Sequence, residues 1–97
     1  MTHTVGDVTY TLHAEPVRQS LSDDVPMLWG FPVQVEADGK VICTKTCFVG
    51  RVSVHTRDPE AADGPSDKLF PLLHELALER VVARLDAREL DDEIVFA

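Results

Sequence analysis

Two runs of alternating apolar and polar residues, on either side of Asp38-Gly39, form the most informative pattern in the chain. This dipeptide favours a two-residue hairpin turn with positive φ at both central residues. The pattern therefore predicts a β-hairpin over residues 26–55. In the register that such a turn sets, the numbers of opposed residues add up to 77, so Trp29 faces Phe48.

The side chains of a strand alternate between two faces, so this register divides the hairpin into an apolar face and a mixed face. The apolar face is the expected core face, and it comprises Met27, Trp29, Phe31, Val33, Val35, Ile42, Phe48, Val52 and Val54. The mixed face places Lys45 and other polar residues beside Val41, Cys43, Cys47 and Val49. Because antiparallel sheets with one wet side usually alternate more cleanly, we expect this patch to be covered by the rest of the chain or by a second copy.

Pro32 constrains the first strand of the hairpin. Proline donates no backbone N–H, and within sheets it is confined to edges and bulges. We therefore expect this strand to be an edge of the sheet, or at least to be unpaired on its outer side beyond Pro32.

The other segments have simpler patterns. Residues 5–14 alternate and are rich in β-branched and aromatic residues, which predicts a first strand. Residues 17–25 show no sustained period and predict a loop, and residues 56–65, with two prolines and a glycine, predict a linker within the domain. The short apolar end, residues 94–96, predicts a final strand returning to the sheet.

The segment Leu72–Arg88 contains no Gly or Pro and many strong helix formers, so it predicts a helix of about 20 residues. Ser66 or Asp67 is the expected N-cap, and Pro71 is tolerated near the start of a helix. At about 100° per residue the helix carries two neighbouring apolar stripes, and a small sheet buries one. We therefore expect a homodimer, with a partner interface formed by Leu69, Leu72, Leu76 and Ala83.

The expected fold is α+β: an antiparallel sheet of three to four strands with one long C-terminal helix packed on one face, forming a single domain over residues 1–97. The sequence shows no apolar run of about 18 residues and no basic-then-apolar leader. We expect a cytoplasmic protein with no membrane partner.

The net charge of −8 is concentrated in the C-terminal part, since residues 1–57 hold six acids and five bases and residues 58–97 hold eleven acids and four bases. No basic patch is evident, so direct binding to nucleic acid is not expected. The acids form two groups: Asp58, Glu60, Asp63 and Asp67 before the helix, and Glu89, Asp91, Asp92 and Glu93 after it. These groups suggest an alternative function, an acidic inhibitor that mimics nucleic acid and titrates a nucleic-acid-binding protein of a mobile element or a defence system.

Cys43 and Cys47 suggest a second alternative, a thiol-dependent enzyme. Their spacing on a strand lacks the turn that brings two thiolates onto one metal ion, and buried inert thiols are the simpler interpretation. The four histidines are scattered and show no metal-binding or catalytic spacing. We predict no catalytic, cofactor-binding or metal-binding residues, and expect a small binding or regulatory protein that works as a homodimer.

Overall fold

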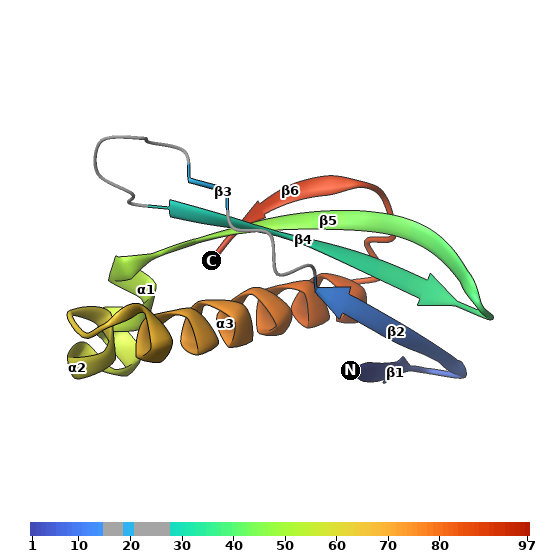
Figure 1. Ribbon diagram of the computed structural model, residues 1–97. Coiled ribbons are helices and arrows are strands. Elements are labelled where there is room, and N and C mark those ends of the chain that lie inside the picture. Colours follow the sequence, from blue (N-terminus) through green and yellow to red (C-terminus); the bar gives the residue numbers. More distant parts are fainter. Residues whose placement is uncertain (15–18, 21–27) are drawn as a thin grey trace.

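The computed structural model describes residues 1–14, 19–20 and 28–97. Strands of a curved sheet lie against one long helix, and two short helices lie at one end of that helix (Figure 1). The strands are β1 Thr2–Val5, β2 Val8–Ala14, β3 Gln19–Ser20, β4 Leu28–Ala37, β5 Lys40–Gly50 and β6 Glu93–Phe96. The helices are α1 Arg51–Arg57, α2 Pro59–Ala62 and α3 Ser66–Asp86.

The sheet is mixed and larger than expected. Its strand order is β1-β2-β4-β5-β6, and the short β3 pairs with β4 beside β2. Neighbouring strands are antiparallel except β5 and β6, which are parallel. The α+β class with one long C-terminal helix on the sheet is confirmed, whereas the purely antiparallel sheet of three to four strands is wrong. The final strand at residues 94–96 is confirmed, and it lies at a sheet edge.

The first strand predicted over residues 5–14 is confirmed over Val8–Ala14, but it is preceded by a second strand, and the two form a hairpin. Residues Thr2–Val5 pair with β2, and the chain turns at Gly6, whose φ is 61°. This left-handed conformation favours glycine because a Cβ would be strained there. The expected loop over residues 17–25 lies largely outside the described residues, which include only β3 from it.

The central hairpin is confirmed, and its turn residues Asp38 and Gly39 have φ of 53° and 76°. The predicted register is correct only next to the turn, where Ala37 opposes Lys40 and Glu36 opposes Val41. The register then shifts by one residue, so that Val35 opposes Cys43 and Ile42 is the extra residue of a β-bulge. Beyond the bulge, Trp29 opposes Val49 and not Phe48.

This shift moves every later side chain of β5 to the other face. Four residues that we expected on the mixed face lie inside, under the helix: Cys43, Lys45, Cys47 and Val49. Phe48 instead lies on the outer face, on the opposite side of the sheet from Trp29, which packs edge-on against Phe70 of α3 at 6.0 Å. The predicted Trp29–Phe48 pair is therefore wrong, and Met27, assigned to the same face, lies outside the described residues.

The prediction that β4 is an edge strand is wrong, because β2 and β3 both pair along its outer side. Residues 33–37 of β4 pair with β2, and residues 29–30 pair with β3. Pro32 lies between these two stretches, and among the described residues its partner is Thr46 of β5. The missing N–H thus falls where the neighbouring strand changes, which satisfies the same constraint without a free edge.

After β5 the chain forms helices where we expected a strand and a linker. Val52 and Val54 belong to α1, where Val54 is buried and Val52 is exposed. Within the predicted linker, residues 56–65, the Asp58 carboxylate accepts a hydrogen bond from the Ala61 N–H at 3.2 Å and caps α2.

The long helix is confirmed, with Pro71 in its second turn. Pro65 occupies its N-cap position, so neither Ser66 nor Asp67 is the cap. One stripe of α3 is buried against the sheet: Leu69, Leu73, Ala77, Val81 and Leu85. These residues meet the inner sides of β2, β4 and β5 and form the core with them.

Candidate functional site

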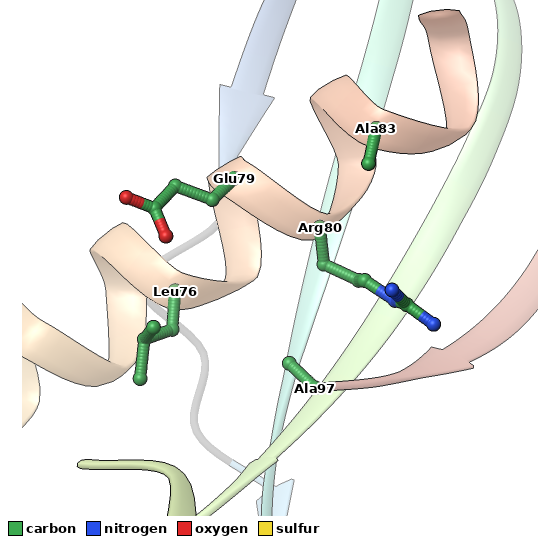
Figure 2. Close-up of a pocket in the computed structure, with 5 residues that line it drawn as sticks. All are labelled: Leu76, Glu79, Arg80, Ala83 and Ala97. Atoms are coloured by element: carbon green, nitrogen blue, oxygen red, sulfur yellow. The ribbon is translucent and has the colours of Figure 1, made fainter. Parts of the chain in front are cut away.

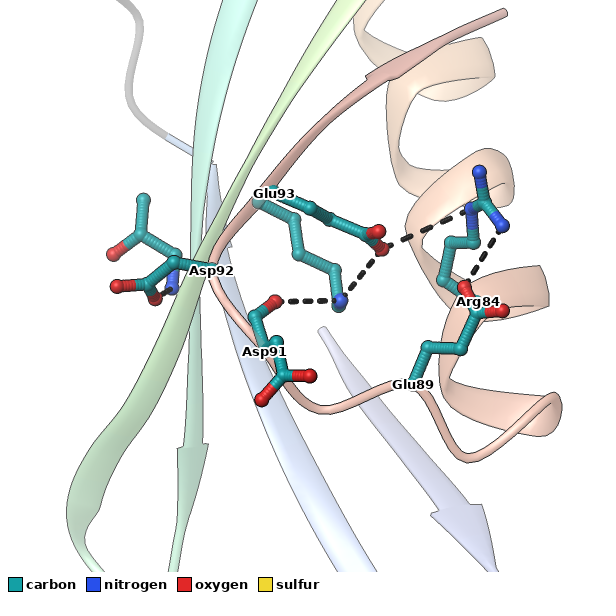
Figure 3. A network of polar contacts seen from close by, with 7 residues as sticks. Arg84, Glu89, Asp91, Asp92 and Glu93 are labelled. Atoms are coloured by element: carbon teal, nitrogen blue, oxygen red, sulfur yellow. Dashed lines mark hydrogen bonds and ion pairs between the residues drawn. The ribbon is translucent and has the colours of Figure 1, made fainter.

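Strand β6 is held to the sheet by a buried lysine. The Lys45 side chain is 0% exposed, and its Nζ donates to Glu93 Oε1 at 2.7 Å and to the Asp91 carbonyl at 3.0 Å (Figure 3). Removing an ammonium group from water is costly unless charged or polar partners replace the water. Lys45 and Glu93 are also opposed in the β5–β6 register, so the pair fixes both the position and the register of β6.

Further contacts hold the acidic segment before β6. The Thr44 N–H donates to the Asp92 carboxylate at 2.7 Å, and Arg84 of α3 donates to Glu89 at 2.8 Å. Arg84 Nε lies 3.8 Å from Glu93 Oε1, which is too long for a hydrogen bond. The hydrogen bond from Lys45 lowers the pKa of Glu93, and the charges of Lys45 and Arg84 add to this effect. The turn between α3 and β6 is thus an organised structure.

The side chains of β6 alternate between the core and the surface. Val95 is buried in the core, whereas Ile94 is 63% exposed and Phe96 is 58% exposed. Phe96 stacks on Phe48 with ring centroids 5.7 Å apart, and a Cβ at Gly30 would lie 2.8 Å from the Phe48 ring. The outer face therefore exposes the apolar side chains of Ile94 and Phe96 at this end, whereas Gly30 and Phe48 are buried.

The backbone of β6 has one open side. The Ala97 N–H donates to the Phe48 carbonyl at 2.9 Å, so the backbone groups of Ala97 point toward β5. Because these groups alternate along a strand, those of Val95 also point toward β5, and those of Ile94 and Phe96 point away. No strand within the described residues pairs with that outward side. Such an edge is a template for another strand.

A hollow of about 300 Å³ adjoins the end of β6. It is lined by Leu76, Glu79, Arg80 and Ala83 of α3 and by Ala97, which follows β6 (Figure 2). Within the described part of the chain, Arg80 forms no hydrogen bond or ion pair. We call these residues together with the exposed side of β6 the β6 surface.

The four residues predicted as a partner interface do not form one surface. Leu69 is 2% exposed and belongs to the core of the chain itself. Leu72 is half-buried and lines a second hollow, of about 450 Å³, between α2 and the start of α3. Leu76 and Ala83 lie on the β6 surface.

The two acidic groups lie at opposite ends of α3, about 30 Å apart for a helix of this length. Asp58 caps α2, and Glu89, Asp92 and Glu93 bind groups of the chain itself. These carboxylates already have structural partners, so they do not form one continuous acidic surface.

Both cysteines are buried, and burial raises their pKa values, that of Cys47 to about 11. A thiol with such a pKa is almost entirely protonated at neutral pH, and the thiolate is the nucleophile. The burial of these thiols gives no support to a thiol-dependent enzyme.

The histidines are dispersed in three dimensions as well. His3 contacts Asp86 at 2.6 Å, His13 contacts Glu36 at 3.0 Å, and the His74 ring packs edge-on against Phe31. Within the described ranges, no group of three or more His, Cys, Asp or Glu residues is placed to hold a metal ion.

Two features at this edge of the sheet were not predicted from the sequence: the outward side chains of β6 and the buried Lys45. Lys45 had a usable signal, since it is the one charged residue between Val41 and Gly50 and the chain has an acidic segment after its helix. Comparison of the chain with protein-family models, with curated proteins and with solved structures found no match. None of the helices in the described ranges combines the length and the hydropathy needed to span a membrane.

Proposed function

We propose that the chain is a small, non-enzymatic binding or regulatory protein that works as a homodimer, with the β6 surface as the subunit interface. The observation that carries this proposal is the exposure of Ile94 and Phe96 on a strand with an open backbone edge. Exposed edges are usually protected by lysine, proline, a bulge or a covering loop. Strand β6 contains neither lysine nor proline, and its one charged residue, Glu93, is bound to Lys45.

The exposed apolar residues of α3 also support an interface at the β6 surface, and not on the outer face of the helix. The apolar stripe of α3 with the deepest burial is already covered by the sheet. The outer face carries charged residues such as Glu75 and Glu79, of which Glu79 pairs with Arg57. The apolar positions left on the flank, Leu76 and Ala83, adjoin β6. A partner at the β6 edge would therefore cover both elements together.

The two alternatives have less support. An acidic mimic of nucleic acid needs its carboxylates along one surface, and the two acidic groups lie at opposite ends of α3. A thiol-dependent enzyme needs an accessible thiolate, and both thiols are buried with raised pKa values.

Sedimentation equilibrium over a range of micromolar concentrations tests the proposal. We expect twice the mass of the chain for the wild type and the mass of one chain for Phe96→Lys, which places a charge in the interface. Val52→Lys is the matched control, because Val52 is 72% exposed on α1, and it should remain dimeric. A monomeric wild type would contradict the homodimer, and a dimeric Phe96→Lys would contradict the β6 surface as the interface.

A further inference from the structure

We infer that β6 pairs in the antiparallel direction with β6 of a second copy, with Val95 opposite Val95 of the partner subunit. This inference rests on the proposed homodimer and specifies its register. A strand edge fits a second copy because a two-fold axis perpendicular to the sheet makes one edge complementary to itself. The two sheets would join into one, with both α3 helices on the same side.

The faces of β6 restrict the possible registers. Residues directly opposite each other in an antiparallel pair project to the same side of the sheet. Ile94 and Phe96 project outward while Val95 is buried in the core. Ile94 is therefore opposed by Ile94 or Phe96 of the partner subunit, and never by the partner's Val95.

The backbone agrees with this restriction. The N–H and C=O groups that point to the open edge belong to Ile94 and Phe96, as the bond from Ala97 to Phe48 indicates. In an antiparallel ladder, a hydrogen-bonded pair exchanges both N–H···O bonds. With Val95 at the centre, Ile94 forms such a pair with Phe96 of the partner subunit, and Phe96 forms the other with the partner's Ile94.

Side-chain pairing favours the Val95-centred register over its neighbours. In this register the two-fold axis gives two equivalent pairs, each of Phe96 with Ile94 of the other subunit. Cross-strand pairs of an aromatic and a β-branched residue stabilise sheets. A register centred on Ile94 would oppose Phe96 with the partner's Asp92, an acid. A register centred on Phe96 would leave Ile94 with no opposed residue of β6.

Charge complementarity supports the same register. Ala97 would lie opposite Glu93 of the partner subunit, and Arg80 adjoins Ala97 in the hollow of the β6 surface (Figure 2). The Arg80 guanidinium would then lie beside the acidic segment of the partner subunit that comprises residues 89–93. Arg80 has no hydrogen bond or ion pair to a described residue of its own chain, so the second copy would supply its counter-charge.

Disulfide trapping tests the register. Ile94→Cys and Phe96→Cys are oxidised mildly, each alone and then mixed in equal amounts, and covalent dimers are measured on a non-reducing gel. In the Val95-centred register positions 94 and 96 of the two copies are opposed, with Cα atoms about 5.5 Å apart, within the range of a disulfide. Two copies of the same position lie about 8 Å apart, beyond that range.

We expect the mixture to cross-link and each variant alone to remain uncross-linked, as should the wild type with its buried thiols. Cross-linking of Ile94→Cys alone or of Phe96→Cys alone would overturn the register. A wild type that is dimeric by sedimentation, with no cross-link in the mixture, would overturn the edge pairing and leave the homodimer standing. A monomeric wild type would overturn both.

Arg80→Glu gives a second measurement that needs no cysteine. We expect the dimer dissociation constant to rise about tenfold or more, because a favourable charge pair becomes a repulsive one. Lys68→Glu is the matched control, since it makes the same charge change at an exposed position near the other end of α3. Equal effects of the two substitutions would overturn the contact between Arg80 and the partner's acidic segment.

Discussion

The Nζ of Lys45 lies 2.7 Å from Oε1 of Glu93, and these two residues are also opposed across β5 and β6. Lys45 is fully buried, whereas about a quarter of the Glu93 side chain is exposed. Removal of one partner therefore affects the other unequally. If Lys45 is removed, water can still solvate the Glu93 carboxylate, whereas if Glu93 is removed, the Lys45 ammonium group keeps only its hydrogen bond to the Asp91 carbonyl. This asymmetry makes the attachment of β6 testable.

We expect Glu93→Ala to lower the free energy of unfolding by about 3 kcal/mol, since it leaves a buried charge without its counter-ion. Lys45→Met should lower it by about 1 kcal/mol or less, because an apolar side chain of similar length replaces the buried charge. Urea unfolding of both variants measures the two values. A larger loss for Lys45→Met than for Glu93→Ala would contradict the asymmetry of the pair.

The same pair predicts a pH dependence. The hydrogen bond from Lys45 lowers the pKa of Glu93. A carboxyl group whose pKa is lower in the folded state adds stability that is complete above its unfolded pKa, about 4.3, and is lost as the pH falls through the folded value. The difference in unfolding free energy between the wild type and Glu93→Gln should therefore shrink as the pH falls from about 6 to below about 4. A difference that stays constant over this range would contradict the pairing.

Gly30 provides a test of the outer face. Its missing side chain leaves room for the Phe48 ring, and an added Cβ would lie 2.8 Å from that ring. We expect Gly30→Ala to lower the unfolding free energy by about 1 to 3 kcal/mol through overpacking. The double variant Gly30→Ala/Phe48→Leu should recover part of this loss. Urea unfolding of the wild type, the two single variants and the double variant gives the double-mutant cycle. Purely additive effects would argue against the contact.

The end of α3 predicts a stabilising substitution. Arg88 has a φ of 60°, and the bonds from Arg88 N–H to Leu85 and from Glu89 N–H to Arg84 close the helix in a Schellman motif. Glycine is the residue best suited to this position. Arg88→Gly should raise the unfolding free energy by about 0.5 to 1 kcal/mol. Arg88→Ala is the matched control and should give no such gain, so equal thermal stabilities of the two variants would contradict this account.

The sequence was informative where structure is decided locally. The turn at Asp38 and Gly39 and the helix predicted over residues 72–88 follow from neighbouring residues. The turn is confirmed, and so is the helix, which the structure gives as Ser66–Asp86. The register of β5 was not predictable in this way, because the bulge at Ile42 turns Lys45 toward the core. An inward lysine becomes acceptable only when Glu93, 48 residues away, pairs with it.

The dependence on residues distant in the sequence also explains the other incorrect predictions. The alternation of Val52 and Val54 matched a strand, but the chain enters α1 at Arg51 and buries only Val54. The parallel pairing of β6 depends on the whole of α3 bringing the chain back to the sheet. Three of the side chains that define the β6 surface are Arg80, Ile94 and Phe96. They come from two separate segments of the sequence, and only the sheet order places them at one edge.

Amide hydrogen exchange of β6, measured residue by residue by NMR at two protein concentrations, tests the central claim most directly. If β6 pairs with a second copy, the N–H groups of Ile94 and Phe96 are protected at high concentration and exchange faster on dilution, while the N–H of Val95, which points to β5, stays protected at both. Fast exchange of Ile94 and Phe96 at every concentration, beside a protected Val95, would contradict the account.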